Sequence, residues 1–366
     1  MIDVVGLTRD LVAVETIDGH ESAALALLAP LLAEAGFTVE ITEHAPGRGT
    51  LIAEWATDRD VPPLCLSGHV DTVPLGAAEW RHDPFQGSLD GDRLYGRGTS
   101  DMKGGVAAIV AAACAFAGSP GRAGLRLVLT AAEETGSAGA RHAAGLLAGK
   151  PCGALLIAEP TGNAVVHGHK GALWLSARAR GVTAHGSMPH LGDNAVYKLA
   201  RAVTRLESYS FGGDPHPVLG APTLNVGTFH SGLNTNSVPD RAEATIDVRT
   251  VLGQSHAAVL ASLGEWVGAE VTLAPLIDLP PVWTGPEDPW AASVGELAGM
   301  PVGEARTVTY FTDASVLTPA FGTVPTVICG PGETEQAHVT DEWVSVTKLQ
   351  ESADLLTRIA VAYGHS

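Results

Sequence analysis

Cysteine is scarce in this sequence: there are only four, at Cys65, Cys114, Cys152 and Cys329, and none stands in a Cys-x-x-Cys pair. A zinc site built from thiolates and a dithiol redox motif both need closely spaced cysteines, so we expect neither. Sparse, isolated cysteines are typical of proteins in a reducing compartment. We therefore expect a cytoplasmic protein.

Basic residues are also few. The chain has 22 Lys and Arg against 40 Asp and Glu, which gives a formal net charge of −18. An acidic surface repels nucleic acids and anionic membranes, so we expect neither as a partner. No uninterrupted apolar run reaches the ~18 residues of a membrane span. The first residues lack the basic region and long apolar region of a secretory signal, so we expect none.

The sequence does have enough apolar residues for a large core. Its 366 residues are 45% hydrophobic and only 17% charged. That composition indicates one large or two medium folded domains and argues against a disordered chain.

Helix-like and strand-like segments alternate along the first part of the chain. This alternation predicts an α/β fold with a mostly parallel sheet and helices on both faces. Helices are predicted at residues 5–35, 102–117 and 136–148, and strands at 37–41, 51–55, 64–67, 125–130 and 154–157.

Near Lys170 the pattern changes to longer strands, which predicts a smaller α+β domain inserted at 171–278. A Pro-rich stretch at 279–289 is typical of a return linker. The main domain is then expected in two parts, 1–170 and 279–366. The remaining predicted strands are 172–179, 223–229, 242–250, 270–274 and 324–329, and the remaining helices are 193–207, 255–267 and 345–363.

Potential metal ligands follow the predicted strands of the main domain. Because the carboxyl ends of parallel strands meet at one edge of a sheet, these side chains are expected to lie close together. A two-zinc site needs a bridging carboxylate with histidine and carboxylate ligands beside it. The candidate ligands are His69, Asp101, Glu134, Glu159 and His338.

Two further carboxylates fit supporting roles. Asp71 stands two residues from His69 and could hydrogen-bond its ring. Glu133 could take a proton from the attacking water and pass it to the leaving amine. Each feature alone has an ordinary interpretation, because a Glu-Glu pair is usually a solvated turn and an Asp at a helix start is usually a cap. A purely structural α/β protein therefore stays a rival interpretation.

Six segments resemble, in order and spacing, the family of zinc deacylases and carboxypeptidases that includes acetylornithine deacetylase, succinyl-diaminopimelate desuccinylase and glutamate carboxypeptidases. The resemblance covers nearly the whole chain. Its segments are Ser67–Pro74, Tyr95–Gly105, Ala132–Gly136, Ala158–Pro160, Thr183–Pro189 and Gly330–His338.

The resemblance implies a role for each candidate residue in a zinc-peptidase-like catalytic domain that carries an inserted lid or dimerisation domain. Asp101 would bridge two zinc ions, for which cobalt could substitute. The first metal would be completed by His69 and Glu159, and the second by Glu134 and His338. Glu133 would be the general base and then the proton donor, and Asp71 would orient His69.

The inserted domain contributes further residues by the same resemblance. His185 would stabilise the developing oxyanion, and in dimeric members the matching histidine reaches the partner's site. Asn236 and Arg249 would hold the substrate's α-carboxylate, for which the planar fork of Arg is well suited. Arg249 could instead pair with Asp247 or Glu243, and His185 could be a structural loop residue. A homodimer is expected.

The implied reaction is removal of an N-acyl group from an amino-acid substrate by a di-zinc-bound hydroxide. Several segments look nearest to acetylornithine deacetylase, including the one around Asp313, which could contact a basic side chain or cap the next helix. A desuccinylase and a dipeptidase or carboxypeptidase are alternatives with the same chemistry. A non-catalytic homologue is disfavoured, because Glu133 and His185 are both present.

Overall fold

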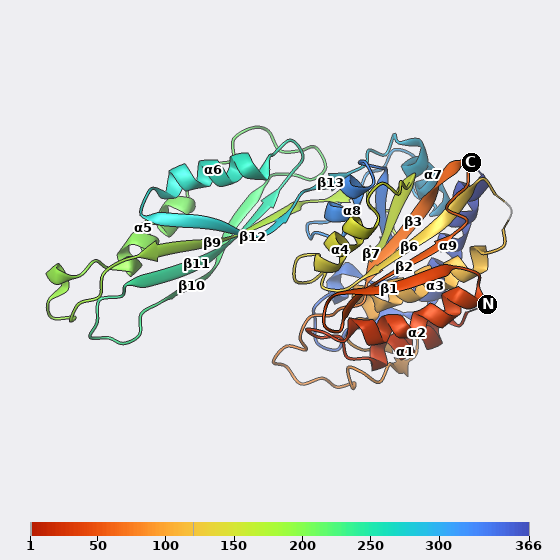
Figure 1. The fold of residues 1–366 in the computed structure, drawn as a ribbon, viewed down its shortest axis with the longest axis horizontal. Helices are drawn as coiled ribbons and strands as arrows, with labels where there is room; N and C mark the ends of the chain where they lie inside the picture. The colour runs from red at the N-terminus through yellow and green to blue at the C-terminus, as the bar shows by residue number, and fades with distance from the viewer. Residues whose placement is uncertain (1, 120, 366) are drawn as a thin grey trace. The chain divides into compact units, whose positions relative to one another are not determined.

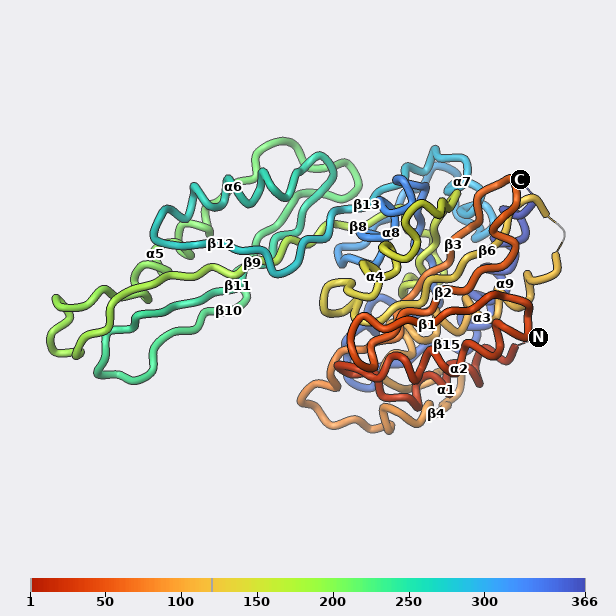
Figure 2. The backbone as a smooth tube through the Cα atoms, in the orientation of Figure 1, coloured from red at the N-terminus to blue at the C-terminus, as the bar shows by residue number. Residues whose placement is uncertain are grey.

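The computed structural model describes residues 2–119 and 121–365, which form two compact units. Among the described residues, unit 1 comprises those up to 168, 283–307 and those from 312 onward, and unit 2 comprises 169–282 and 308–311. Figure 2 shows both ends of the chain in unit 1, whereas unit 2 is formed from its middle. The chain crosses between the units at β8 (Gly168–His169) and β13 (Val282–Trp283), and again on either side of residues 308–311. Within the described residues, no helix has the length and apolarity that a membrane crossing requires.

Unit 1 is built on a six-stranded sheet in the order β1-β2-β6-β3-β7-β14 (Figure 1). The four strands from β6 to β14 run parallel, and β1 and β2 are antiparallel at one edge. The mostly parallel α/β sheet predicted from the sequence is confirmed. The strands are β1 (Thr38–Ala45), β2 (Arg48–Trp55), β3 (Val61–His69), β6 (Ala123–Thr130), β7 (Ala154–Pro160) and β14 (Thr326–Gly330).

Helices cover both faces of this sheet, as the apolar strands require (Figure 1). On one face α1, α2, α3 and α9 pack together, and on the other α4 packs against α8. The centre of the core is α3, which is alanine-rich and buried along almost its whole length. The helices of unit 1 are α1 (Val4–Ala13), α2 (Glu21–Glu34), α3 (Gly104–Phe116), α4 (Ala138–Leu146), α7 (Pro289–Leu297), α8 (Ala314–Ala320) and α9 (Val346–His365).

A small three-stranded sheet, β15-β5-β4, lies outside the main sheet of unit 1. It joins β4 (Ser88–Asp90) and β5 (Arg93–Tyr95) to β15 (Trp343–Ser345), which stands far along the chain. The chain also has two short 3-10 turns, η2 (Pro189–Leu191) in unit 2 and η3 (Thr334–Gln336) in unit 1. The small sheet matters for function, because it brings the residues just before β15 to the turn that follows β5.

Unit 2 is an antiparallel four-stranded sheet in the order β10-β11-β9-β12. Alternate residues face two helices and form a separate apolar core, and the other residues of each strand are mainly polar. This alternation is the pattern of a sheet covered on one face. The elements are β9 (Gly171–Arg180), α5 (Ala195–Leu206), β10 (Thr223–Ser231), β11 (Arg241–Thr250), α6 (His256–Val267) and β12 (Val271–Leu279).

Two sequence expectations about local structure are wrong. Residues 5–35 form two helices with a break at 14–20, where Asp18, Gly19 and His20 have positive φ. The Pro-rich stretch at 279–289 is not only a linker, because it contains β13 and the start of α7. Asp288 caps α7 by accepting hydrogen bonds from the amides of Trp290 and Ala291.

Candidate active site

His69 is the last residue of β3, at the carboxyl edge of the parallel strands. Its side chain is almost fully buried. Its Nε2 lies 3.3 Å from Asp101 Oδ1 and 3.7 Å from Glu159 Oε1. Glu159 is near the end of β7, the strand beside β3, so the neighbouring strand ends bring these side chains together as the sequence predicted.

Asp101 lies on a wide turn, η1 (Thr99–Lys103), that leads into α3. Its backbone torsions are not helical, so it is not a simple helix cap. Instead, the turn is fixed by the buried carboxylate of Glu342. This carboxylate accepts hydrogen bonds from the backbone amides of Gly98, Ser100 and Asp101 at 2.8–3.1 Å. The same carboxylate accepts from Arg97 Nη1 at 2.7 Å, which compensates its charge.

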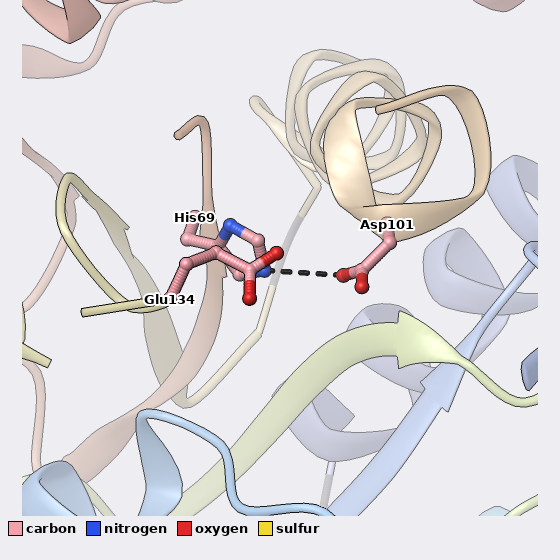
Figure 3. Close-up of side chains that lie close together, drawn as sticks. All are labelled: His69, Asp101 and Glu134. Carbon is pink, nitrogen blue, oxygen red and sulfur yellow. Dashed lines mark ion pairs between the residues drawn. The ribbon is translucent and has the colours of Figure 1, made fainter. Parts of the chain in front are cut away.

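Glu134 and His338 complete the cluster around Asp101. His338 Nε2 lies 3.3 Å from Asp101 Oδ2 and 3.1 Å from the Glu134 carboxylate. His69, Asp101 and Glu134 each offer a ligand atom, and these atoms lie within 4.8 Å of one another. Figure 3 shows the three side chains pointing toward one another from separate segments of the chain.

Asp71 contacts His69, although mainly through its backbone. Its carbonyl oxygen lies 3.0 Å from His69 Nδ1, while its carboxylate oxygen lies 3.5 Å away. The carboxylate accepts hydrogen bonds from the amides of Glu133 and Glu134, both at 3.1 Å. Asp71 therefore holds the histidine ligand and the Glu-Glu turn against each other.

Two buried glutamates, Glu133 and Glu159, and the partly buried Glu134 gather here with no lysine or arginine bound to them among the described residues. Burial raises the pKa of Glu133, Glu134 and Glu159 above the ordinary glutamate value, because it disfavours their charged forms. Glu133 Oε1 is buried without a hydrogen-bond partner among the described residues.

The pKa values of the two histidines are also raised, but by neighbouring carboxylates and not by burial. Burial alone would lower the pKa of His69, but the carboxylates around it, led by Glu159, raise it well above its ordinary value. Hydrogen bonds to Asp101 and Glu134 raise the pKa of His338 to about 10. Burial would raise the pKa of Asp101, yet its contacts with the two histidines hold it well below its usual range.

This donor set fits a pair of divalent cations. Buried carboxylates that repel one another, interleaved with imidazole nitrogens, need positive charge among them to be stable as anions. Oxygen and imidazole donors in this mixture suit zinc and similar ions. The chain therefore has a candidate metal centre at the carboxyl edge of its main sheet, and the residues that would hold the ions are His69, Asp101, Glu134, Glu159 and His338.

Sequence reasoning missed the role of Glu342. Glu342 follows the segment Gly330–His338 in the sequence. Only the pairing of β15 with β5 brings its carboxylate within hydrogen-bond distance of the turn that carries Asp101. Lys103 is also fully buried and donates a hydrogen bond to the Val14 carbonyl at 2.8 Å. Burial lowers its pKa to about 7. Both residues support the backbone around Asp101.

In unit 2, His185 and Asn236 lie together in neighbouring loops. Residues 185 and 237 form a β-bridge, and the Gly186 amide donates to the Asn236 carbonyl at 2.7 Å. The His185 side chain is exposed, and its Nδ1 lies 2.8 Å from Ser187 Oγ.

Arg249 lies at the opposite end of the unit 2 sheet. It pairs with Ala172 at the start of β9, whereas the loops of His185 and Asn236 extend from the end of the sheet where Arg241 pairs with Arg180. The strand between Arg241 and Arg249 spans about 26 Å at ~3.3 Å per residue. One chain therefore does not bring Asn236 and Arg249 to the same carboxylate.

Arg249 forms an ion pair with Asp247, one of the two alternative partners expected from the sequence. Its Nε lies 2.9 Å from Asp247 Oδ1. The guanidinium carbon also lies 5.9 Å from the centre of the Trp174 ring and 6.0 Å from that of Phe311. The two rings contact each other edge to face and lie beside the guanidinium, whose Nη2 also donates to Asp247 Oδ2 at 3.1 Å. The remaining N–H groups are available to a carboxylate.

Histidine and carboxylate ligands at the carboxyl edge of a parallel sheet, with a buried glutamate beside them, define a metal-dependent hydrolase. The chain matches the model of peptidase family M20/M25/M40 over residues 65–362 and belongs to that family. Its members include metal-dependent hydrolases of amide bonds, which is the class of enzyme predicted from the sequence.

Curated relatives extend over almost the whole chain. An acetylornithine deacetylase of Vibrio vulnificus is 32% identical over 365 residues, covering 94% of this chain and 93% of the relative. An acetylornithine deacetylase of Proteus mirabilis is 30% identical and covers 96% of this chain and 95% of the relative.

Solved structures agree on the fold. An M20 family metallo-carboxypeptidase of Sulfolobus solfataricus has a TM-score of 0.81 at 19% identity and covers all of both chains. A dinuclear metal-binding M20 peptidase of Bacillus subtilis has a TM-score of 0.73 at 17% identity, covering 99% of this chain and 97% of the other. The fold class predicted from the sequence is confirmed.

Proposed function

We propose that this enzyme removes the acyl group from N-acyl amino acids, with N-acetylornithine as the leading substrate and two zinc ions as cofactor. The observation that carries the reaction is the convergence of His69, Asp101 and Glu134 beside the buried Glu133. The substrate rests on the curated relatives, which align with this chain over nearly its whole length. Cobalt could substitute for zinc, because its ligand preferences are similar.

Bound at these ligands, the two ions would lower the pKa of water and polarise the amide carbonyl. Glu133 is positioned for the proton transfers, because it is buried and has an unpartnered carboxylate oxygen. It would take the proton from the attacking water and deliver it to the nitrogen of the leaving amine. Burial raises the pKa of Glu133 above the ordinary glutamate value, a direction that favours a group which must accept a proton before it donates one.

The substrate side of the proposal uses both ends of unit 2. Arg249 would bind the α-carboxylate, since its guanidinium lies beside two aromatic rings and its pairing with Asp247 does not use all of its donors. His185 and Asn236 extend from the far end of the same sheet, which supports their action in the site of a second copy. We therefore propose a homodimer in which each chain supplies His185 and Asn236 to its partner. The four free cysteines suit the reducing cytoplasm.

A dipeptidase or carboxypeptidase is the second candidate, because a metallo-carboxypeptidase has the same two-unit fold over its full length. A substrate panel separates the candidates. The zinc-loaded protein would be assayed for amine release from N-acetylornithine, N-acetyl-lysine, N-succinyl-diaminopimelate and several dipeptides. Fastest turnover of the acetylated basic amino acids supports the proposal. Fastest turnover of dipeptides or of the succinyl compound replaces its substrate and leaves the reaction class intact.

A further inference from the structure

The burial and hydrogen bonding of Asp313 fit neither a substrate contact nor a helix cap. It directly precedes α8, but its side chain makes no capping hydrogen bond to that helix. It is only 1% exposed, so a substrate side chain cannot reach it without displacing the protein around it.

The carboxylate of Asp313 instead contacts the strand that leads to the Glu-Glu turn. Its Oδ2 accepts a hydrogen bond of 2.5 Å from Thr130 Oγ1. Thr130 is the last residue of β6 and pairs with His69 in the sheet. The Asp313 carboxylate therefore binds the residue at which β6 ends and the turn to Glu133 begins.

The turn itself is short and internally bonded. The amides of Gly136 and Ser137 both donate to the Glu133 carbonyl, and the turn has positive φ at Ala132 and Ser137. These bonds close the turn on itself, so a contact that fixes its start also restrains the backbone of Glu133 and Glu134.

Asp313 holds the start of this turn through its bond to Thr130. Its other carboxylate oxygen, Oδ1, is buried without a hydrogen-bond partner among the described residues. The helices that follow the two segments, α4 and α8, also pack against each other. Asp71 holds the amides of Glu133 and Glu134 at the middle of the turn, so two carboxylates fix it at different points.

We propose that Asp313 is a positioning residue for the amide hydrolysis, which holds the turn carrying Glu133 and Glu134 through Thr130, and that it does not contact the substrate. This inference rests on the reaction class of the proposed function but not on its particular substrate. It replaces the substrate-binding role that the resemblance implied for Asp313.

The partner residue gives the sharpest test, because Thr130→Val and Thr130→Ser form a matched pair. Valine keeps the shape and removes the donor, whereas serine keeps the donor. We expect Thr130→Val to lower kcat about 10- to 100-fold with KM unchanged. Thr130→Ser should recover most of that loss.

Asp313→Ala and Asp313→Asn test the other side of the bond, since asparagine keeps an acceptor oxygen. Asp313→Ala should lower kcat for acidic, neutral and basic substrates alike, and Asp313→Asn should recover part of it. The double variant Thr130→Val with Asp313→Ala should be no slower than the slower single variant. If Asp313→Ala fails to fold, the Thr130 pair alone decides.

Two results would overturn the inference. One is a rise in KM confined to substrates with a basic side chain while kcat is unchanged, which would make Asp313 a substrate contact. The other is equal kcat in Thr130→Val and Thr130→Ser.

If the wild-type enzyme turns over no substrate of the panel, the proposed function fails independently of this inference. Zinc affinity by chelator competition then decides, and it should be lower in Thr130→Val than in Thr130→Ser; equal affinities contradict the role.

Discussion

Single carboxylates set the geometry of this site through bonds to backbone amides. Glu342 binds the amides around Asp101, and Asp71 binds those of Glu133 and Glu134. Charge-assisted bonds of this kind are stronger than neutral ones and have strict geometry. They explain how a turn that lacks regular helix torsions can still hold the candidate bridging ligand, Asp101, in one place.

His169 gives a residue-scale prediction about pH. It is fully buried, its Nδ1 lies 2.8 Å from the Lys170 carbonyl, and burial lowers its pKa to about 4. Between that value and the ordinary value of 6.5, the unfolded chain binds a proton that the folded chain does not. The contribution of neutral His169 to the stability of the folded chain is therefore complete above about pH 6.5 and is lost as the pH falls to about 4.

His169→Asn keeps a donor for the Lys170 carbonyl and removes the titration. In metal-free protein, the free energy of unfolding of the wild type should fall by about 3 kcal/mol more than that of His169→Asn between pH 7 and pH 4. Urea unfolding at both pH values measures the difference. Parallel losses in the two proteins would show that His169 does not titrate as described.

At the residue scale, the sequence alone proposed all five candidate ligands. Four of them follow strands whose carboxyl ends are readable from apolar runs, and Asp101 was proposed from its turn before a helix and from motif spacing that resembles a known family. The sequence did not predict the role of Glu342, since that depends on a pairing between β15 and β5 across more than half of the chain. It also did not predict the burial of Asp313, which follows from the packing of α8 on α4.

At the element scale, α3 and β7 approach each other closely in the core. A Cβ at Gly105 would lie 2.1 Å from the Ala158 carbonyl oxygen, so only glycine allows the helix to pass this close to the strand. Asp101 precedes α3 and Glu159 follows Ala158, so the same contact sets the separation of two candidate ligands.

Gly105→Ala should therefore lower the stability of the protein by about 1–3 kcal/mol, as overpacking of a core does, and weaken zinc binding. Gly145→Ala in α4 is the matched control, because its Cβ would meet nothing within 4 Å. It should raise stability by about 0.5–1 kcal/mol. Thermal unfolding and zinc titration measure both variants. An unchanged unfolding midpoint in Gly105→Ala would contradict the close approach.

The elements themselves were largely predictable where strands are long and apolar. Pattern alone did not indicate that residues 5–35 are two helices, because both have apolar periodicity and the break at 14–20 contains a single glycine. The short strands β4, β5 and β15 were also missed. Three residues are too few to show an alternating pattern, and their pairing is set by tertiary contacts.

At the scale of the whole molecule, the proposed substrate contacts lie at opposite ends of the unit 2 sheet, with Arg249 at one end and the loops of His185 and Asn236 at the other. If His185 acts in a partner's site, two inactive variants should complement each other. Mixing His185→Ala with Glu133→Gln and allowing subunit exchange should restore about a quarter of the wild-type activity, since half of the dimers are mixed and each has one complete site. No recovery, with mixed dimers shown by mass, would place His185 in its own chain's site.

The most direct test of the account is turnover by Glu133→Gln beside a count of bound zinc. Glutamine keeps the shape of Glu133 but cannot accept and return a proton. We predict that the variant binds two zinc ions per chain, as the wild type does, unfolds at a similar temperature and loses at least ~100-fold in kcat on the best substrate of the panel. Turnover close to that of the wild type with two zinc ions bound would contradict the mechanism.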